Sequence, residues 1–153
     1  MKPRILVSMC LLGVNCRYDG GGKAAKGIAE LMELAELVPV CPETLGGLPI
    51  PRVPSERVGE RVLAKDGGDV TANFNRGARE VLKLAELFGA KCAMLKERSP
   101  SCGAGQIYDG SFTGALVPGD GVTAELLKAN GVAVYGESQV WELIDMLRGG
   151  NER

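Results

Sequence analysis

Three of the five cysteines follow short apolar segments, which is where an α/β fold places its functional groups. Cys10 comes just after Ile5–Ser8, Cys41 ends the apolar run that begins at Leu37, and Cys102 follows a third run. Because the ligand crevice of an open parallel sheet lies beyond the carboxyl ends of its strands, we expect the three thiols to converge. The chain has no histidine, so a metal held there would be bound mainly by sulfur. Such a site favours iron–sulfur or zinc over harder metals.

The other two cysteines have weaker claims to this site. Cys92 lies inside a strand-like run, where a free thiol packs as a small buried hydrophobe. The glycine-containing loop between Cys10 and Cys16 could bring both to one centre or leave Cys16 as a packing residue. An odd cysteine count without a CxxC pair argues against a disulfide framework, a zinc ribbon and thioredoxin-like chemistry.

Length and charge set the broad class of the protein. A chain of 153 residues favours one domain, which we expect over residues 1–148, followed by a short flexible tail at 149–153. The net charge of −1 shows no basic bias towards nucleic acid. No apolar run reaches the ~20 residues of a membrane span, and no signal peptide is visible. We therefore expect a cytoplasmic protein, monomeric or weakly homodimeric, with no membrane partner.

Short apolar strands alternate with amphipathic helices along the chain. The predicted strands are Ile5–Ser8, Leu37–Cys41, Lys91–Leu95 and Val132–Tyr135, and the predicted helices are Ala24–Leu37, Thr71–Gly89, Gly121–Gly131 and Glu137–Leu147. This alternation is typical of βαβ units with right-handed crossovers. It predicts an α/β protein, a small Rossmann-like three-layer fold with a mostly parallel sheet.

Two segments depart from this alternation. Residues 48–56 contain three of the eight prolines and are expected to form an extended loop. The following residues, Glu60–Val70, suit a small hairpin that turns at Asp66–Gly68. Residues 99–119 show no clear element, and an unstructured loop of that length is often functional.

Three motifs resemble, in order, those of the thiouracil desulfidase family. The first comprises Ser8–Gly13 and Cys16–Gly20, the second comprises Cys41–Glu43, Gly46–Pro49 and Pro51–Arg52, and the third comprises Leu95–Lys96 and Ser99–Gly103. The resemblance covers nearly the whole chain, and the motifs are specific in combination. The one departure is Met9, which stands where the family often has a small residue such as alanine.

The resemblance implies an iron–sulfur cofactor. Three cysteines of the family hold a [4Fe-4S] cluster, and they correspond here to Cys10, Cys41 and Cys102. The fourth iron is then open, and a soft thiocarbonyl sulfur should bind it, which makes the adjacent ring carbon electrophilic. Because one iron lacks a protein ligand, an aerobically prepared sample can lose the cluster.

The resemblance also implies the reaction and its catalytic groups. The family, which is bacterial, removes sulfur from thiolated uracil and related thio-pyrimidines without net redox change, and whether the substrate is a base, a nucleoside or a nucleotide stays open. Glu43 matches the catalytic carboxylate, a general base for water, and the catalytic serine is assigned to Ser99 with Ser101 as the alternative. Asp19, Lys96 and Ser101 are expected to contact the substrate, although loop-tying or solvated roles also fit Asp19 and Lys96.

Other interpretations stay open at this point. Tyr108 and Phe112 could stack on a pyrimidine, but aromatic residues in long loops more commonly anchor the loop. The protein could be a non-catalytic iron–sulfur or zinc-binding protein, such as a sulfur carrier. A nucleotide-binding role for Gly20–Lys23 is weak, because this run lacks the spacing of a P-loop or a dinucleotide fingerprint.

Overall fold

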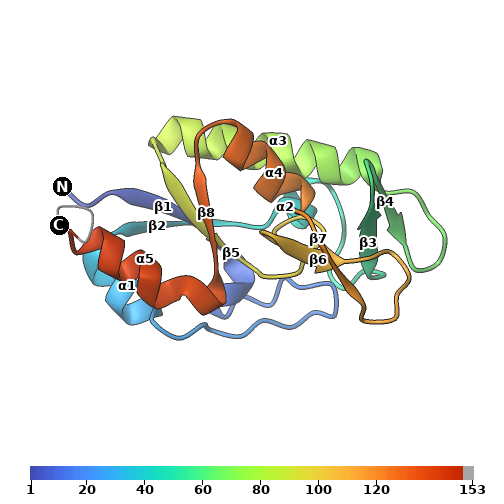
Figure 1. The fold of residues 1–153 in the computed structure, drawn as a ribbon, viewed down its shortest axis with the longest axis horizontal. Helices are drawn as coiled ribbons and strands as arrows, with labels where there is room; N and C mark the ends of the chain where they lie inside the picture. Colours follow the sequence, from blue (N-terminus) through green and yellow to red (C-terminus); the bar gives the residue numbers. More distant parts are fainter. Residues whose placement is uncertain (150–153) are drawn as a thin grey trace.

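A four-stranded parallel sheet forms the centre of the computed structural model, which describes residues 1–149 (Figure 1). Its order is β2-β1-β5-β8, and its strands are β1 (Arg4–Ser8), β2 (Glu36–Val40), β5 (Cys92–Leu95) and β8 (Ala133–Gly136). Each strand lies within one residue of its predicted bounds, so the prediction of a three-layer α/β fold is confirmed. Apart from Gly149, the predicted tail at 149–153 lies outside the described residues.

Helices cover both faces of this sheet. Figure 1 shows α1 (Ile28–Leu34) and α5 (Val140–Leu147) on one face, with α3 (Thr71–Phe88) and α4 (Val122–Ala129) on the other. In β1, Ile5 and Val7 join the hydrophobic cluster beneath α1 and α5, whereas Leu6 joins the cluster beneath α3 and α4. Full burial of each such side chain contributes about 1.5–3 kcal/mol. No described helix is both long and apolar enough to cross a membrane.

Two helices differ from their predicted bounds by three residues or more, whereas α3 and α4 differ by at most two. The helix predicted at Ala24–Leu37 spans only Ile28–Leu34, because Gly27 adopts a φ of +83° and the chain enters β2 at Glu36. The segment predicted as Glu137–Leu147 begins with the 3₁₀ turn η2 (Glu137–Gln139) before α5. Two further short elements, η1 (Met9–Leu12) and α2 (Pro42–Leu45), follow β1 and β2 directly.

The predicted hairpin at 60–70 has a different register from the one expected. The antiparallel pair is β3 (Ser55–Val58) with β4 (Arg61–Ala64), and its turn lies at Gly59–Glu60. A second turn does form at Asp66–Gly68, but it leads only to a single bridge between Leu63 and Asp69. Val62 of β4 contributes to the pairing across both turns and is buried against α3.

The expectation of no clear element at 99–119 is wrong in two places. β6 (Gln106–Tyr108) and β7 (Leu116–Pro118) form an antiparallel pair within this segment. Each strand has only three residues, which is too short for a periodic apolar pattern to reveal.

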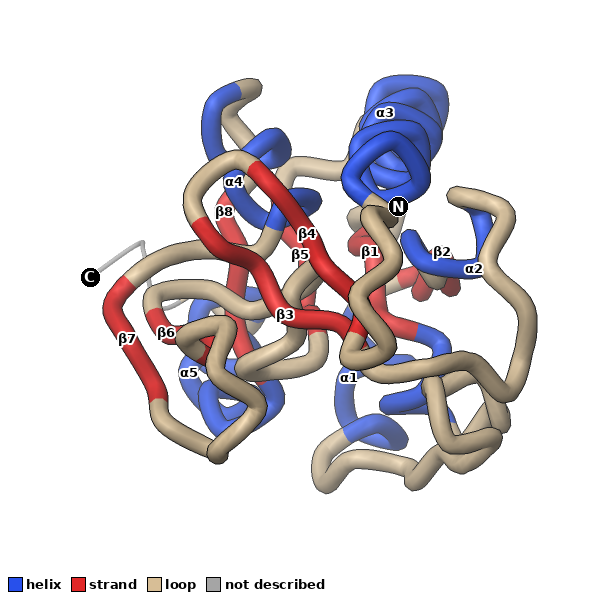
Figure 2. The backbone as a smooth tube through the Cα atoms, turned by 90° about the vertical axis from the view of Figure 1, so that its right-hand side faces the viewer, coloured by secondary structure: helices blue, strands red, loops and turns tan. Residues whose placement is uncertain are grey.

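The strand order places a crevice at the carboxyl ends of β1 and β5. The chain runs from β1 to β2 on one side and returns to β5 on the other, so the order reverses at this point. Crevices at such switch points bind ligands in open α/β sheets. Figure 2 shows the β3–β4 and β6–β7 pairs in front of this end of the sheet.

Candidate active site

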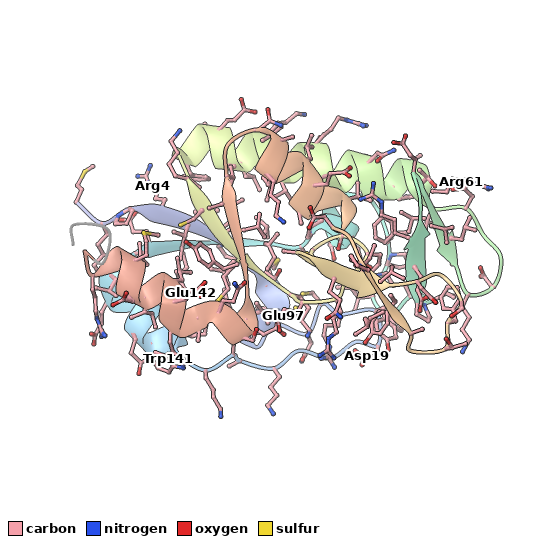
Figure 3. All side chains as sticks on the ribbon, in the orientation of Figure 1. Arg4, Asp19, Arg61, Glu97, Trp141 and Glu142 are labelled. Carbon is pink, nitrogen blue, oxygen red and sulfur yellow. The ribbon has the colours of Figure 1, made fainter. Side chains whose placement is uncertain are left out.

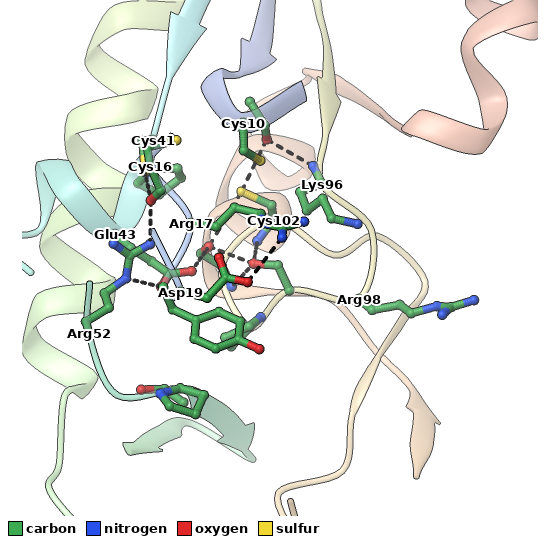
Figure 4. A pocket seen from close by; sticks show the side chains of 18 of the residues that line it. Cys10, Cys16, Arg17, Asp19, Cys41, Glu43, Arg52, Lys96, Arg98 and Cys102 are labelled. Carbon is green, nitrogen blue, oxygen red and sulfur yellow. Dashed lines mark hydrogen bonds and ion pairs between the residues drawn. The ribbon is translucent and has the colours of Figure 1, made fainter. Parts of the chain in front are cut away.

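A cavity of about 530 Å³ opens at the carboxyl end of the sheet. Its wall includes every residue that the sequence predicted for the site, namely Cys10, Asp19, Cys41, Glu43, Lys96, Ser99, Ser101 and Cys102. The volume is typical of small-molecule sites. In the view of Figure 4, Cys41 comes from one side of the pocket and Cys10 and Cys102 come from the other.

Three strands deliver the predicted ligand thiols. Cys10 lies in the turn after β1, Cys41 directly precedes α2, and Cys102 lies in the loop after β5. All three are buried. Burial, together with the nearby Cys102 and Cys16 thiols, raises the pKa of Cys10 to about 12, and the Lys96 ammonium acts in the opposite direction. All three thiols line the same cavity.

Hydroxyl groups donate to two of these sulfurs. Thr44 Oγ1 lies 3.1 Å from Cys41 Sγ, and the hydroxyls of Ser8 and Ser101 lie 3.6 and 3.5 Å from Cys102 Sγ. Burial raises the pKa of Cys102 to about 11, while the nearby hydroxyls of Ser101 and Ser8 act in the opposite direction. Sequence reasoning missed the sulfur contacts of Ser8 and Thr44, although a hydroxyl at the end of an apolar strand was a visible signal.

The donor chemistry of this cavity fits an iron–sulfur cofactor. Within residues 1–149, no three His, Cys, Asp or Glu side chains are arranged to hold one metal ion. Cys10, Cys41 and Cys102 nevertheless line one cavity, and hydroxyls already point at two of the sulfurs as they would at thiolates. Thiolate ligands are those that hold iron–sulfur clusters.

Glu43 is held at both of its carboxylate oxygens. Arg52 Nε donates to Oε1 at 2.9 Å, and Ser101 Oγ donates to Oε2 at 3.0 Å. Arg52 also donates to the main-chain carbonyls of Cys16 and Pro49. The Arg52 side chain is 6% exposed and that of Glu43 is 16% exposed, so the pair sits inside the wall and fixes the direction of the carboxylate (Figure 4).

The two candidate serines lie in one hydrogen-bonded loop. Ser99 Oγ lies 2.9 Å from Ser101 Oγ and accepts the N–H groups of Ser101 and Cys102, each at 3.1 Å. The carbonyls of Pro100 and Ser101 accept the first N–H groups of α4, which have no partner within a helix. The start of α4 therefore anchors the loop. Ser101 is fully buried, whereas Ser99 is half-buried.

The two charged residues predicted to contact substrate both have protein partners. Lys96 Nζ lies 2.6 Å from Glu137 Oε2, and Asp19 Oδ2 lies 3.1 Å from a guanidinium nitrogen of Arg17. Figure 3 shows Asp19 near the hairpin end of the molecule. Both residues line the cavity, so their ion pairs orient them at its wall and do not remove them from it.

The remaining two cysteines differ in their position relative to the cavity. Cys92 is buried in the cluster beneath α1 and α5 and does not line the cavity, as expected. Cys16 does line it, and Cys41 Sγ lies 3.9 Å from the Cys16 carbonyl oxygen. Burial, with the nearby Cys41 thiol, raises the pKa of Cys16 to about 11.

Comparisons with known proteins agree with this arrangement. A solved structure of TudS, a [4Fe-4S]-dependent thiouracil desulfidase, is 46% identical and has a TM-score of 0.91, covering 96% of this chain and 99% of TudS. YbbK, an uncharacterized protein of Bacillus subtilis (strain 168), is 40% identical over 150 residues, covering 92% of this chain and 99% of YbbK. The 2-thiouracil desulfurase family model matches residues 5–139. With its thiol-lined cavity and its three motifs, the chain belongs to the 2-thiouracil desulfurase family.

Proposed function

We propose that this protein is a [4Fe-4S]-dependent desulfidase that hydrolyses a thiolated uracil or a related thio-pyrimidine. In the net reaction, water supplies the oxygen that replaces sulfur on the ring carbon, and hydrogen sulfide leaves, so no electrons are exchanged. The family match and the TudS structure support this activity. The observation that carries the proposal is a single cavity that combines three buried thiols with the Glu43 carboxylate, which accepts a hydrogen bond from Ser101.

We assign Cys10, Cys41 and Cys102 as the residues that would hold the cluster. When bound, the cluster would supply a soft Lewis acid for the thiocarbonyl group. Binding must displace the thiol protons, since the pKa values of Cys10 and Cys102 lie above neutral pH. The hydroxyls of Thr44 and Ser8 then stabilise the thiolates that remain.

Glu43 is the general base of the proposed reaction. A carboxylate has about four lone-pair positions, and Arg52 and Ser101 occupy only two of them. The others can accept a proton from water in the cavity. Because Arg52 holds Oε1, the carboxylate keeps its direction while it accepts the proton, which general-base catalysis requires.

Ser99 and Ser101 extend this carboxylate into a hydrogen-bonded chain. Ser101 donates to Glu43, and Ser99 lies within hydrogen-bonding distance of Ser101. Ser99 is the more exposed of the two to the cavity, so we propose that its hydroxyl meets the substrate. Ser101 then passes a proton between Ser99 and Glu43.

The proposal is tested by anaerobic reconstitution with iron and sulfide. The reconstituted protein should bind about four irons, show the broad visible absorbance of a cluster, and release uracil and sulfide in equal amounts from 2-thiouracil. Thiouridine and its phosphate, supplied separately, distinguish a base from a nucleoside or a nucleotide as the substrate. A protein that binds the cluster but releases no uracil from any of them would instead be a non-catalytic iron–sulfur protein.

We further propose that residues 1–148 act as one domain, in the cytoplasm, as a monomer or weak homodimer. All five cysteines are free thiols, which suits a reducing compartment. Light scattering during size-exclusion chromatography tests the oligomeric state, and a concentration-independent dimer would contradict it.

A further inference from the structure

Two residues of the cavity wall have an unusual backbone conformation. Among residues 1–149, Arg98 and Phe112 are the non-glycine residues with positive φ, at +67° and +58°. Both line the cavity. The left-handed region is sparsely populated by residues other than glycine, and a bulky side chain there is an outlier. Such strain persists only where the surroundings enforce it, and it concentrates at functional sites.

A buried carboxylate enforces the conformation of Phe112. Glu56 Oε1 accepts the N–H groups of Gly110 at 2.9 Å and Phe112 at 3.1 Å, although 54 and 56 residues separate them in sequence. Glu56 lies in β3 and is only 9% exposed. Gly110 packs so tightly on Val58 that a Cβ there would lie 2.2 Å from Val58 Cγ2. β3 therefore holds the loop that carries Phe112.

The Phe112 ring has no role in the described hydrophobic core. It belongs to none of the three hydrophobic clusters of the described residues, and it is half-buried. Polar groups anchor its loop instead: Asp109 Oδ1 accepts the Ser111 N–H at 2.8 Å, and Ser111 Oγ lies 2.6 Å from Thr113 Oγ1. An anchoring role for the aromatic ring is therefore redundant.

We propose that Phe112 stacks on the pyrimidine ring of the substrate, and that Glu56 is the positioning residue that holds Phe112 in place. This inference rests on the proposed function and adds the residue that recognises the planar heterocycle. Every pyrimidine has a π-face, so an aromatic surface binds the ring whichever thiolated position reacts. The strained backbone at Phe112 is the cost of directing the ring at the cavity.

The test compares matched variants of the reconstituted holoenzyme. Phe112→Ala should raise the KM for 2-thiouracil about 10- to 100-fold, as expected for the loss of one stacking contact, with a smaller change in kcat. Phe112→Tyr should restore KM to within about threefold of the unaltered protein. Phe88→Ala removes a half-exposed aromatic that contacts Arg4 and does not line the cavity, and it should leave KM unchanged.

The positioning role of Glu56 is tested by comparing its variants with those of Phe112. Glu56→Ala should raise KM as Phe112→Ala does, whereas Glu56→Gln keeps an acceptor oxygen and should largely preserve KM. The double variant should be no worse than Phe112→Ala, because residues that act through one contact are not additive. Additive effects would assign Glu56 a separate role and overturn the positioning claim.

Binding of uracil, measured by calorimetry, separates this inference from the proposed function. Phe112→Ala should weaken uracil binding by the same factor as KM, with iron content unchanged. An unaltered uracil affinity, or a loss of iron, would overturn the stacking role even if desulfidation is established. If the unaltered protein desulfurates nothing, the proposed function fails, and the uracil titration still decides whether Phe112 binds the ring.

Discussion

An arginine–glutamate pair lies at each end of the central sheet, in very different surroundings. Arg4 and Glu36 begin β1 and β2, are 46% and 60% exposed, and lie 3.1 Å apart. Arg52 and Glu43 lie beyond the other end, at 2.9 Å, with 6% and 16% exposure. Figure 3 shows Arg4 towards the left of the molecule and the cavity residue Asp19 to the right of its centre.

The difference between these pairs lies in their additional partners. An exposed pair contributes about 0–1 kcal/mol and is screened by salt, and Arg4 and Glu36 bridge neighbouring strands, with the Phe88 ring as a further contact of Arg4. A buried charge needs further hydrogen bonds to offset desolvation, and Arg52 and Glu43 have them, from two carbonyls and from Ser101. The buried ion pair at the switch point is therefore held in a fixed direction by its further partners, while Glu43 keeps lone-pair positions for chemistry.

Two cysteines near β5 show the same contrast. Cys92 begins the strand, and burial alone raises its pKa to about 11. Cys102 follows the strand and is buried to a similar extent, but Ser8 donates to its sulfur and Ser101 Oγ lies 3.5 Å from it. Burial therefore does not distinguish Cys102 from Cys92, whereas the hydroxyls beside the Cys102 sulfur do.

The largest expected effect tests the contrast between Cys102 and Cys92. Cys102→Ala should lower the iron content after anaerobic reconstitution to near background and abolish desulfidation, because a ligand is lost. Cys92→Ala, the same substitution at the other end of β5, should leave iron unchanged. Iron assays and visible spectra measure both. Equal iron in the two variants would remove Cys102 from the ligand set.

The next largest effect tests the contrast between the buried and the exposed ion pair. Glu43→Gln should retain the cluster and lower kcat about 10²- to 10⁴-fold, since general-base catalysis is typically worth that much. Glu36→Gln at the exposed pair should change kcat less than twofold. Uracil release measures the rate for both. If Glu43→Gln stays fully active, the carboxylate is not the base.

The serine chain should show a smaller loss. Ser99→Ala should keep iron and lower activity more than Ser101→Ala, because Ser99 is the more exposed residue at the cavity wall and also accepts the Cys102 N–H group. Initial rates of sulfide release, normalised to iron, check this order. The reverse order would make Ser101 the hydroxyl that meets the substrate.

The Cys92 thiol should give stability a measurable pH dependence. Its pKa is about 11 in the folded protein, against 9.0 for the ordinary thiol. Between these values the unfolded chain loses the proton and the folded chain keeps it, so the free energy of unfolding falls as pH rises from about 9 to about 11. Urea unfolding should show a shallower decline for Cys92→Ala, and identical slopes would contradict the shift.

The smallest effect is expected at Cys16. Cys16→Ser should retain most of the iron after reconstitution, because three other thiols already serve as the assigned ligands. Iron assays run beside Cys10→Ser provide the comparison. A loss as large as that of Cys10→Ser would show that four cysteines bind the cluster, and the open iron position would lose its basis.

Local patterns in the sequence were sufficient to predict the strands of the central sheet. Apolar runs such as Ile5–Ser8 and Lys91–Leu95 became strands within one residue of their predicted bounds, because a fully buried parallel strand requires continuous apolar residues. The cysteines that follow these runs then necessarily reach the carboxyl end of the sheet. The fold and the meeting of Cys10, Cys41 and Cys102 at one cavity were therefore predictable.

Contacts between distant segments could not be predicted from the sequence. The β3–β4 pair packs Val62 against α3, and the pairing of Ser101 with Glu43 joins residues 58 positions apart. The hydrogen bond from the Phe112 N–H group to Glu56 joins residues 56 positions apart.

The amino-acid sequence by itself thus determined which groups arrive at the site, because strand periodicity is a local property. Only the tertiary structure decided which of those groups touch. The direction of a side chain in a loop depends on hydrogen bonds and packing from elements that have no fixed spacing in the chain.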